Sequence, residues 1–307
     1  MGGDLGGVPP GPGIAMTAAP SISVVIPCYN SGATLPQTLD SLRAQTLPPH
    51  EVIVVDDGSS DPATVALLDS LTAVRLVRQP NRGLPAARNA GFAAATGEFV
   101  LPLDADDWLE PDALEKLVAA LRREPTAAFA FSHLRLEGES RGVLAKHYNF
   151  FEQLFLNQLP YALLIRRSEW AAAGGYDETM RRGYEDWEFN VRLGARGGFG
   201  VVVPEPLFHY RVTSGGMLLS KSRHLHGSLW AEVQARNPAV YRWTALWKLW
   251  RIWRRRPSTY PLGLFFPWLA LHRFLPDAAF QAVFRRLVQY SHGSRVALRA
   301  PAKERAP

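Results

Sequence analysis

The sequence predicts an α/β fold in which a mostly parallel central sheet is flanked by helices and followed by a helical C-terminal extension. Three observations predict it. Short β-branched runs alternate with amphipathic segments from Ile22 onward, polar clusters directly follow several of these runs, and a tail rich in Arg and Trp follows residue 237. Apolar strands joined by helices are typical of a parallel sheet covered on both faces.

The first half of the chain alternates strand and helix at short spacing. Residues 22–26 are a β-branched run that predicts the first strand, and apolar residues three and four apart predict a helix over 34–45. Pro62 begins the next helix, with Ser60 or Asp61 as its N-cap. Further strands are expected at 52–55, 74–77, 99–101 and 199–203, and further helices at 84–95, 111–122 and 184–195. Residues 132–160 carry no readable motif.

The composition is that of a protein with a packed core, because 47% of the 307 residues are hydrophobic and 20% are charged. A single cysteine, Cys28, excludes a disulfide framework within the chain and is expected to be a small, half-buried residue without catalytic function. Residues 1–20 are rich in Gly and Pro without Lys or Arg, so we expect a disordered leader and not a signal peptide. A domain over 21–237 and an extension over 238–307 follow, in a cytoplasmic protein.

The net charge of +6 is unevenly distributed. Residues 238–307 contain 13 Lys and Arg against Asp277 and Glu304, whereas the preceding part has a net charge of −5. Nucleic acid is usually bound by the folded body of a protein, and here that body is acidic. We therefore expect no nucleic-acid partner, and the basic tail needs a local explanation.

Polar clusters follow the first, second and fourth expected strands. They are 28–30 (CYN), 56–57 (DD) and 104–107 (DADD). Ligands bind at the carboxyl ends of the strands in such sheets, so these clusters are expected to converge. Asp104 and Asp106 can hold Mg²⁺ or Mn²⁺ together with the oxygens of a diphosphate. The alternative is that acidic turns simply end strands and cap helices, with Asp107 capping a helix that begins near Glu110.

The clusters belong to a longer ordered series of motifs. Jointly the series resembles the family 2 glycosyltransferases, which have the GT-A fold, and the resemblance covers about residues 21–211. It implies an inverting enzyme with an Asp-x-Asp motif. The motifs are 23–30 (SVVIPCYN), 51–61 (EVIVVDDGSSD), 81–83 (NRG) with 87–91 (ARNAG), 104–107 (DADD), 174–178 (GGYDE) and 185–187 (EDW).

The resemblance implies nucleotide-binding roles for Pro27, Tyr29, Asp57, Arg88 and Asp104. Tyr29 is similar to the tyrosine that stacks on the base, and Asp57 to the aspartate that contacts the base or ribose. Arg88 resembles the helix arginine near the base or phosphates, and Asp104 the aspartate on the ribose side. Stacking of an aromatic ring on a flat base is physically reasonable but does not select one base.

The resemblance also implies that Asp106 is the ligand of Mn²⁺ or Mg²⁺ and Asp186 the general base. A base on the opposite face of the sugar from the leaving group gives one in-line displacement and inverts the anomeric centre. The alternative for Asp186 is an acid that favours the first turn of its helix, and this is the expected role of Glu185. Trp187 either packs in the core or forms a wall of the acceptor site.

Other residues have two readings each. His209 is either a neighbour of the metal or a strand residue with satisfied nitrogens, and here it precedes Tyr210 where the family pattern places a histidine after the aromatic-arginine pair. The motif at 214–216 (SGG) is expected to close over the nucleotide. Tyr148 and the pair at 150–151 (FF) lie either in the acceptor site or in the core.

We expect a metal-dependent, inverting transfer of a sugar from a nucleotide-diphospho-sugar to a hydroxyl of a glycan or lipid-linked acceptor, in polysaccharide or glycolipid biosynthesis. A UDP-sugar is the expected donor, although relatives also use GDP- and dTDP-sugars. One alternative is a binding scaffold without transfer activity. The other is a sugar nucleotidyltransferase, but residues 27–32 (PCYNSG) lack the basic phosphate loop that it would need.

The aromatic residues of the tail recur at helical spacing. Trp243, Trp247 and Trp250 fall on one face, with Lys248 and Arg251 beside them. This pattern is typical of a helix in a membrane interface, and it predicts peripheral membrane contact through 243–275, at the inner face of the plasma membrane. The alternative is that these aromatic residues pack back on the catalytic domain.

Overall fold

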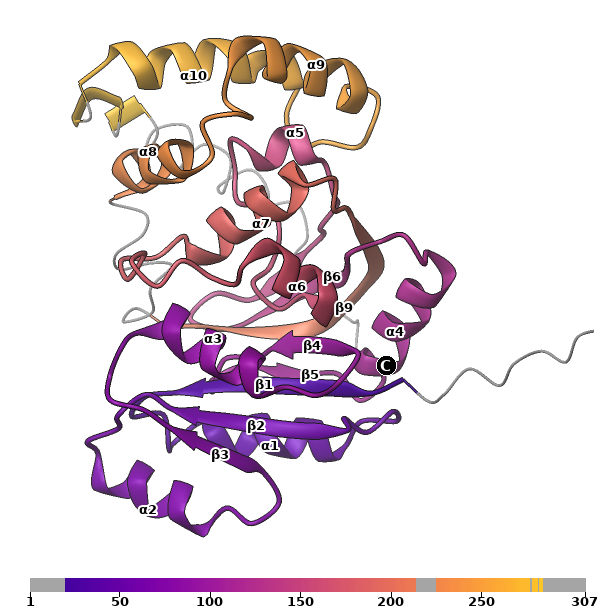
Figure 1. Cartoon of the computed structure of the whole chain (residues 1–307), viewed down its shortest axis with the longest axis vertical. Helices are drawn as coiled ribbons and strands as arrows, with labels where there is room; N and C mark the ends of the chain where they lie inside the picture. Colours follow the sequence, from indigo (N-terminus) through magenta and orange to yellow (C-terminus); the bar gives the residue numbers. More distant parts are fainter. Residues whose placement is uncertain (1–19, 214–224, 277, 281, 284–307) are drawn as a thin grey trace, which may run out of the picture.

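The computed structural model describes residues 20–213, 225–276, 278–280 and 282–283, so the expected leader and the motif at 214–216 lie outside the described residues. One sheet runs through the described part, in the order β3-β2-β1-β4-β8-β6-β9-β5, with β7 paired to β6 (Figure 1). The strands are β1 (Ile22–Cys28), β2 (Glu51–Asp56), β3 (Arg75–Arg78), β4 (Phe99–Pro102), β5 (Trp108–Leu109), β6 (Phe129–Gly138), β7 (Gly142–Leu144), β8 (Leu164–Arg166) and β9 (Gly200–Val212).

The predicted α/β fold is confirmed, and its sheet is mixed. Strands β1 to β4 are parallel, as the first half of the sequence predicts. The antiparallel strand β8 then separates them from β6 and β9, which are parallel to one another. Antiparallel β5 closes the order on β9.

Helices cover both faces of the sheet. Successive side chains of β1 are buried on opposite faces of the sheet. Val24 and Ile26 belong to one buried cluster, and Val25 belongs to another. Helix α3 approaches the sheet so closely at Gly91 that a Cβ there would lie 2.2 Å from a methyl carbon of Val25. The helices of this region are α1 (Leu35–Arg43), α2 (Pro62–Ser70), α3 (Leu84–Ala94), α4 (Ala113–Arg123), α6 (Arg167–Ala173) and α7 (Glu185–Ala195).

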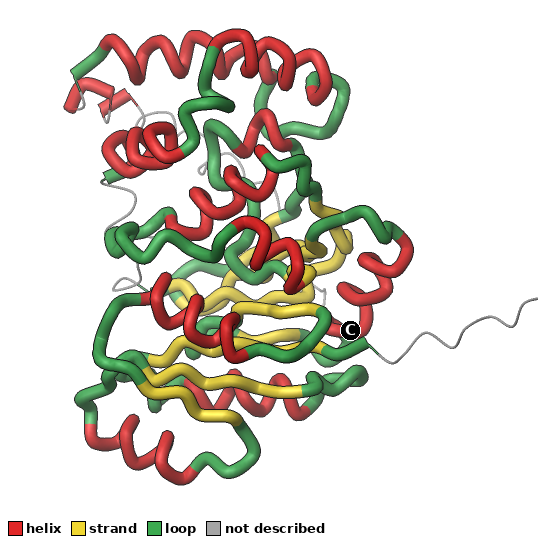
Figure 2. The backbone as a smooth tube through the Cα atoms, viewed as in Figure 1, coloured by secondary structure: helices red, strands yellow, loops and turns green. Residues whose placement is uncertain are grey.

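The C-terminal extension is helical, as expected, and forms the layer farthest from β3 and α2 (Figures 1 and 2). It shares a third buried cluster with α7 and with α5 (Phe150–Gln153), whose aromatic members include Phe151, Trp187 and Trp230. None of the described helices is both long enough and apolar enough to cross a membrane. The extension's own helices are α9 (Trp243–Trp253), the short 3-10 helix η2 (Leu262–Leu264) and α10 (Phe265–Phe274). Helix α8 (His226–Arg236) precedes the extension and packs against it, with His272 of α10 bonded to Gln234 and to the Gly227 carbonyl, so it is counted with the extension layer.

Candidate active site

The polar clusters converge at one edge of the sheet, as predicted. Cys28 pairs with Asp56 in register at the ends of β1 and β2, and the Asp57 amide donates to the Cys28 carbonyl at 2.9 Å. Strand β4 runs parallel to β1, so residue 104 follows it at the same edge. Cys28 itself is fully buried, and burial raises the pKa of its thiol.

Tyr29 is the most open of the residues expected to bind nucleotide. Its side chain is 49% exposed directly after β1, where a flat ring is accessible to a ligand. Pro27 is buried within β1. Asp57 is also buried, and both of its oxygens have partners. Its Oδ1 accepts from Gln79 Nε2 at 2.7 Å and its Oδ2 accepts from the Gly83 amide at 2.9 Å. Asp57 thus organises the turn that carries the Asn-Arg-Gly motif.

Arg88 occupies a different position from the one expected near the base or phosphates. Its side chain is only 2% exposed, and it donates to Asp104 Oδ1 at 2.8 Å and to Glu185 Oε1 at 2.7 Å. The guanidinium also lies over the rings of Tyr161 and Tyr176, 4.9 and 5.7 Å from their centroids. Arg88 therefore links two acidic motifs from inside the protein and holds Asp104, the aspartate expected on the ribose side.

Asp107 does not cap a helix, contrary to the alternative considered for it. Its Oδ1 accepts from the Arg211 amide at 2.7 Å, and its Oδ2 accepts from the Tyr161 hydroxyl at 2.5 Å. The Tyr161 oxygen in turn accepts from the Asp104 amide at 2.9 Å. These bonds fix the loop between β4 and β5, and burial raises the pKa of Asp107.

Asp106 is the half-buried carboxylate of this loop. Its carboxylate accepts from its own backbone amide and lies in the field of Arg211, both of which favour the charged form. Burial, reinforced by the negative charge of Asp104, outweighs them and raises the pKa of Asp106 to about 6. Two neighbouring carboxylates form a donor set that a hard divalent cation accepts when phosphate and water complete its shell. The described residues contain no group of three acidic, His or Cys side chains that could hold a metal ion without such a ligand.

Asp186 lies in the first turn of α7, where its Oδ2 accepts from Asn157 Nδ2 at 3.1 Å. Neighbouring Glu185 is buried against Arg88. Burial raises the pKa of Glu185 to about 7, although the charge of Arg88 opposes this rise. Asp186 is therefore the half-buried acid of the pair and Glu185 the enclosed one.

The hydroxyl of Tyr210 lies in the electrostatic field of both acidic motifs. Its pKa is raised by burial and by the negative charges of four acids, which are Asp104, Asp106, Asp107 and Asp186. The Arg88 guanidinium, which bonds Asp104 at 2.8 Å and Glu185 at 2.7 Å, joins the loop after β4 to the first turn of α7. Strand β9 brings Tyr210 there.

Several residues with two readings prove to be structural. Trp187 is fully buried and donates from Nε1 to the Gln153 carbonyl at 2.5 Å, so it packs in the core and is not an acceptor-facing wall. Both nitrogens of His209 are engaged by carboxylates, those of Glu110 at 2.9 Å and Glu137 at 3.2 Å. That geometry matches the satisfied-strand reading. Tyr148 and residues 150–151 belong to buried clusters and not to an open site.

Sequence reasoning missed four residues that build the site. Asn89 holds the Gly-Gly-Tyr-Asp-Glu motif, because its side chain donates to the Tyr176 carbonyl at 2.8 Å and accepts from the Tyr176 amide at 2.8 Å. One indication of this role was available in the sequence, because Asn89 lies beside Arg88 in the motif at 87–91. Lys146, whose amine lies in the field of Asp186, had no such indication. Tyr161 and Asn157 had none either, since all three residues lie in or next to the segment without a readable motif.

Comparison with known proteins identifies relatives of this chain. The sequence profile described as Glycosyl transferase family 2 matches residues 23–178. The putative glycosyltransferase EpsH of Bacillus subtilis is 38% identical over 104 residues, which are 32% of this chain and 30% of that protein. The chondroitin synthase of Pasteurella multocida is 28% identical over 190 residues, 59% of this chain and 19% of that protein. The chain thus spans less than a third of the length of these curated relatives.

Solved structures share the fold. Residues 1–349 of TarS from S. aureus, in complex with UDP-GlcNAc, superpose with a TM-score of 0.56 at 22% identity, covering 70% of this chain and 66% of that one. The same fragment without a named ligand covers 88% of this chain and 91% of that one, again with a TM-score of 0.56, at 21% identity. At this identity the likeness establishes the fold.

Proposed function

The chain belongs to glycosyl transferase family 2, whose profile matches about half of it, and from that premise we propose that it is a metal-dependent, inverting glycosyltransferase. The donor is a nucleotide-diphospho-sugar, with a UDP-sugar preferred because a structural neighbour binds UDP-GlcNAc. The acceptor is a hydroxyl of a glycan or lipid-linked glycan. Relatives that are named for chondroitin and succinoglycan synthesis support polysaccharide biosynthesis.

In this proposal Tyr29 stacks on the base, since its ring is open beside the sheet edge. Asp104 faces the ribose while Arg88 keeps it in place from inside the protein. Asp106, aided by Asp104, would hold Mn²⁺ or Mg²⁺, which when bound would neutralise the charge that develops on the leaving diphosphate. A fixed charge of this kind stabilises the transition state.

Asp186 takes the proton of the acceptor hydroxyl as its oxygen attacks the anomeric carbon. The new bond joins the acceptor oxygen to that carbon, and the bond that breaks joins the carbon to the diphosphate oxygen, which leaves with the bonding electrons. The attack is in line with the departing bond, so the anomeric configuration inverts. A base half-buried at the site and held by Asn157 fits this step.

One observation supports the proposal: the Arg88 guanidinium bonds both Asp104 of the Asp-x-Asp loop and Glu185 of the first turn of α7, so the neighbouring Asp106 and Asp186 belong to adjoining elements. A metal ligand and a base on two sides of one space are what a displacement at a sugar carbon requires. A scaffold protein would have no need to keep both. Pro27 and Asp57 support the site from within, which completes the nucleotide-binding edge.

Calorimetric titration of UDP, GDP and dTDP, each with and without Mn²⁺, tests the proposal. We expect Mn²⁺-dependent binding of UDP, loss of that binding in Asp106→Asn, and retained binding without transfer in Asp186→Asn. Lack of response to all three nucleotides would favour the scaffold alternative. Normal transfer by Asp186→Asn would refute the assignment of the base.

We also propose that the extension contacts a membrane surface peripherally, at the inner face of the plasma membrane. Helix α9 buries Leu246 against the catalytic domain but leaves Trp243 48% and Trp247 54% exposed. One face of α9 therefore packs on the catalytic domain, and the other face is open for contact with a membrane. Lys248 and Arg251 are exposed beside these rings, and cations next to interfacial Trp fit anionic headgroups.

A further inference from the structure

Residues 149–157, here called the connecting segment, lie between the C-terminal extension and the first turn of α7. The segment contains helix α5. One end of the segment is hydrogen-bonded to the extension and the other end to Asp186. Asn149 Nδ2 donates to the carbonyls of Trp253 at 3.3 Å and Pro257 at 3.1 Å, both in the extension. Asn157 Nδ2 donates to Asp186 Oδ2 at 3.1 Å.

A buried carboxylate strengthens the end next to the extension. Glu152 is fully buried, and its Oε1 accepts from the Thr259 amide at 2.8 Å. Its Oε2 lies 2.6 Å from His147 Nε2. Buried charged groups of this kind are costly to leave without partners, so the extension cannot leave this position without exposing or stranding Glu152.

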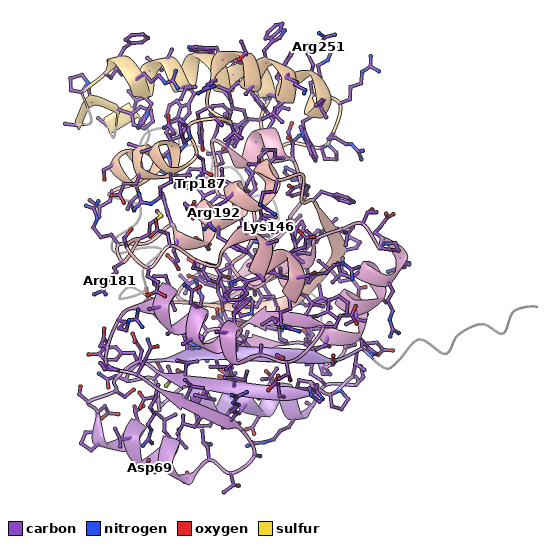
Figure 3. All side chains as sticks on the ribbon, viewed as in Figure 1. Asp69, Lys146, Arg181, Trp187, Arg192 and Arg251 are labelled. Atoms are coloured by element: carbon purple, nitrogen blue, oxygen red, sulfur yellow. The ribbon has the colours of Figure 1, made fainter. Side chains whose placement is uncertain are left out.

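The middle of the segment is bonded on both sides as well. The Leu154 carbonyl accepts from Trp230 Nε1 at 2.9 Å and from the Tyr241 hydroxyl at 2.7 Å, which anchors it to the extension layer. The adjacent Gln153 carbonyl accepts from Trp187 Nε1 at 2.5 Å, which anchors it to α7. Figure 3 places Trp187 in this middle layer, between the sheet and the C-terminal helices.

Gln153 also joins the bonds to the expected base. Its Nε2 donates to Asn157 Oδ1 at 3.3 Å, while Asn157 donates to Asp186. The second oxygen of Asp186 accepts from the Trp187 amide at 2.8 Å. Both oxygens of the carboxylate are thus oriented, one by α7 itself and the other by the connecting segment.

We propose that Asn157 is a positioning residue for Asp186 and that the connecting segment makes the orientation of Asp186 depend on the docked C-terminal extension. The inference rests on the proposed role of Asp186 as the base. A general base works only when it lies within hydrogen-bond reach of the proton it removes, so free rotation of its carboxylate costs rate and not donor affinity. The extension is therefore part of what makes the site competent.

Hydrogen exchange of the full chain tests the connection without any substrate. Asn149→Ser keeps an N-cap for α5 but removes the amide nitrogen that donates to Trp253 and Pro257, because the serine hydroxyl is one bond shorter. We expect amide exchange to become at least about fivefold faster in residues 150–157 and 185–190, from the loss of about one net hydrogen bond. Faster exchange confined to 253–259, with no change at 185–190, would overturn the connection.

Turnover tests the positioning residue. In Asn157→Leu, which has no donor, release of UDP from UDP-GlcNAc with Mn²⁺ should show kcat about tenfold lower with KM changed less than about twofold. A fall in kcat with little change in KM is the readout that a merely structural role would not give.

Gln158→Leu is the matched control, because this neighbour is equally half-buried and bonds to Gln153 through its backbone amide alone. It should leave kcat and KM unchanged. A normal kcat in Asn157→Leu, or an equal loss in the control, would refute the positioning role. If the wild-type chain does not turn over UDP-GlcNAc, the proposed donor is wrong, and the exchange experiment alone decides the role of the connecting segment.

Discussion

Arg88 Nη1 lies 2.7 Å from Glu185 Oε1, and both side chains are almost completely buried. The pair joins the Ala-Arg-Asn-Ala-Gly motif of α3 to the Glu-Asp-Trp motif of α7. Because the same guanidinium also holds Asp104, one side chain joins the loop after β4 to the first turn of α7. Two motifs far apart in sequence are thus required together for a structural reason.

Arg88→Met should therefore destabilise the fold strongly. Removing one partner of a buried ion pair costs about 3 to 5 kcal/mol, because an uncompensated charge remains inside. Urea unfolding measures the change in the free energy of unfolding. Arg43→Met is the control, since its pair with Asp40 is exposed and worth at most about 1 kcal/mol. The double variant Arg88→Met/Glu185→Gln should lose less than the sum of the two single variants; strict additivity would contradict the buried pair.

Tyr29→Ala should weaken nucleotide binding without destabilising the protein. The side chain is about half exposed and contributes little to the core, so the free energy of unfolding should change by less than about 0.5 kcal/mol. Stacking on a base is worth about 1 to 3 kcal/mol, so the Kd for UDP with Mn²⁺ should rise about 5- to 100-fold. Calorimetry measures it, with Tyr29→Phe as the control that keeps the ring. An unchanged Kd in Tyr29→Ala would exclude stacking.

Local sequence was sufficient for the first half of the fold. The β-branched run of β1 and the apolar spacing of α1 depend on neighbours in the chain, and both elements lie where the pattern predicts them. Asp61 caps α2 by accepting from the Thr64 amide at 2.9 Å, which is likewise a local interaction. Strand β6 and helix α5 lacked such a pattern, because their side chains are buried on several sides by distant elements.

The position of the candidate site could be predicted from the sequence, but the role of each side chain within it could not. Strand ends locate Asp104 and Asp106 at the correct edge, since a parallel sheet gathers its carboxyl ends there. Whether a polar side chain meets a ligand or another side chain depends on tertiary contacts, and these bury Arg88 and engage Asp57. Tyr161 could not be found, because it reaches Asp107 from a loop without any local signal.

Replacing both exposed tryptophans of α9 should weaken binding to anionic vesicles. Each large apolar side chain contributes about 1.5 to 3 kcal/mol when it leaves water, so Trp243→Ser/Trp247→Ser should bind vesicles at least about tenfold more weakly. Flotation with phosphatidylglycerol vesicles measures this, and high salt should weaken wild-type binding. Val143→Ser/Leu144→Ser, which changes exposed apolar residues of β7, is the control. Absence of binding by the wild type at any lipid composition would remove the membrane proposal.

Lys146 should be acetylated at lower pH than an ordinary lysine, because burial lowers its pKa to about 8. A lowered pKa means that the uncharged amine, which is the reactive form, predominates above pH 8. Pulsed acetylation followed by mass spectrometry should therefore show a midpoint near pH 8 for this residue. Lys116 is the comparison, because hydrogen bonds to Asp112 and Glu205 raise its pKa. Limited access slows Lys146 equally at every pH, so the midpoint and not the absolute rate is diagnostic.

The same measurement tests whether Lys146 shares the space of the proposed base. The negative charge of Asp186 favours the ammonium and partly offsets the effect of burial. Removing that charge in Asp186→Asn should move the midpoint of Lys146 acetylation to lower pH while leaving Lys116 unchanged. A midpoint that stays at the wild-type value would mean that the two charges do not interact, and the first turn of α7 would then not face the loop that carries Lys146. A shift would place a titratable cation beside Asp186, the proposed base.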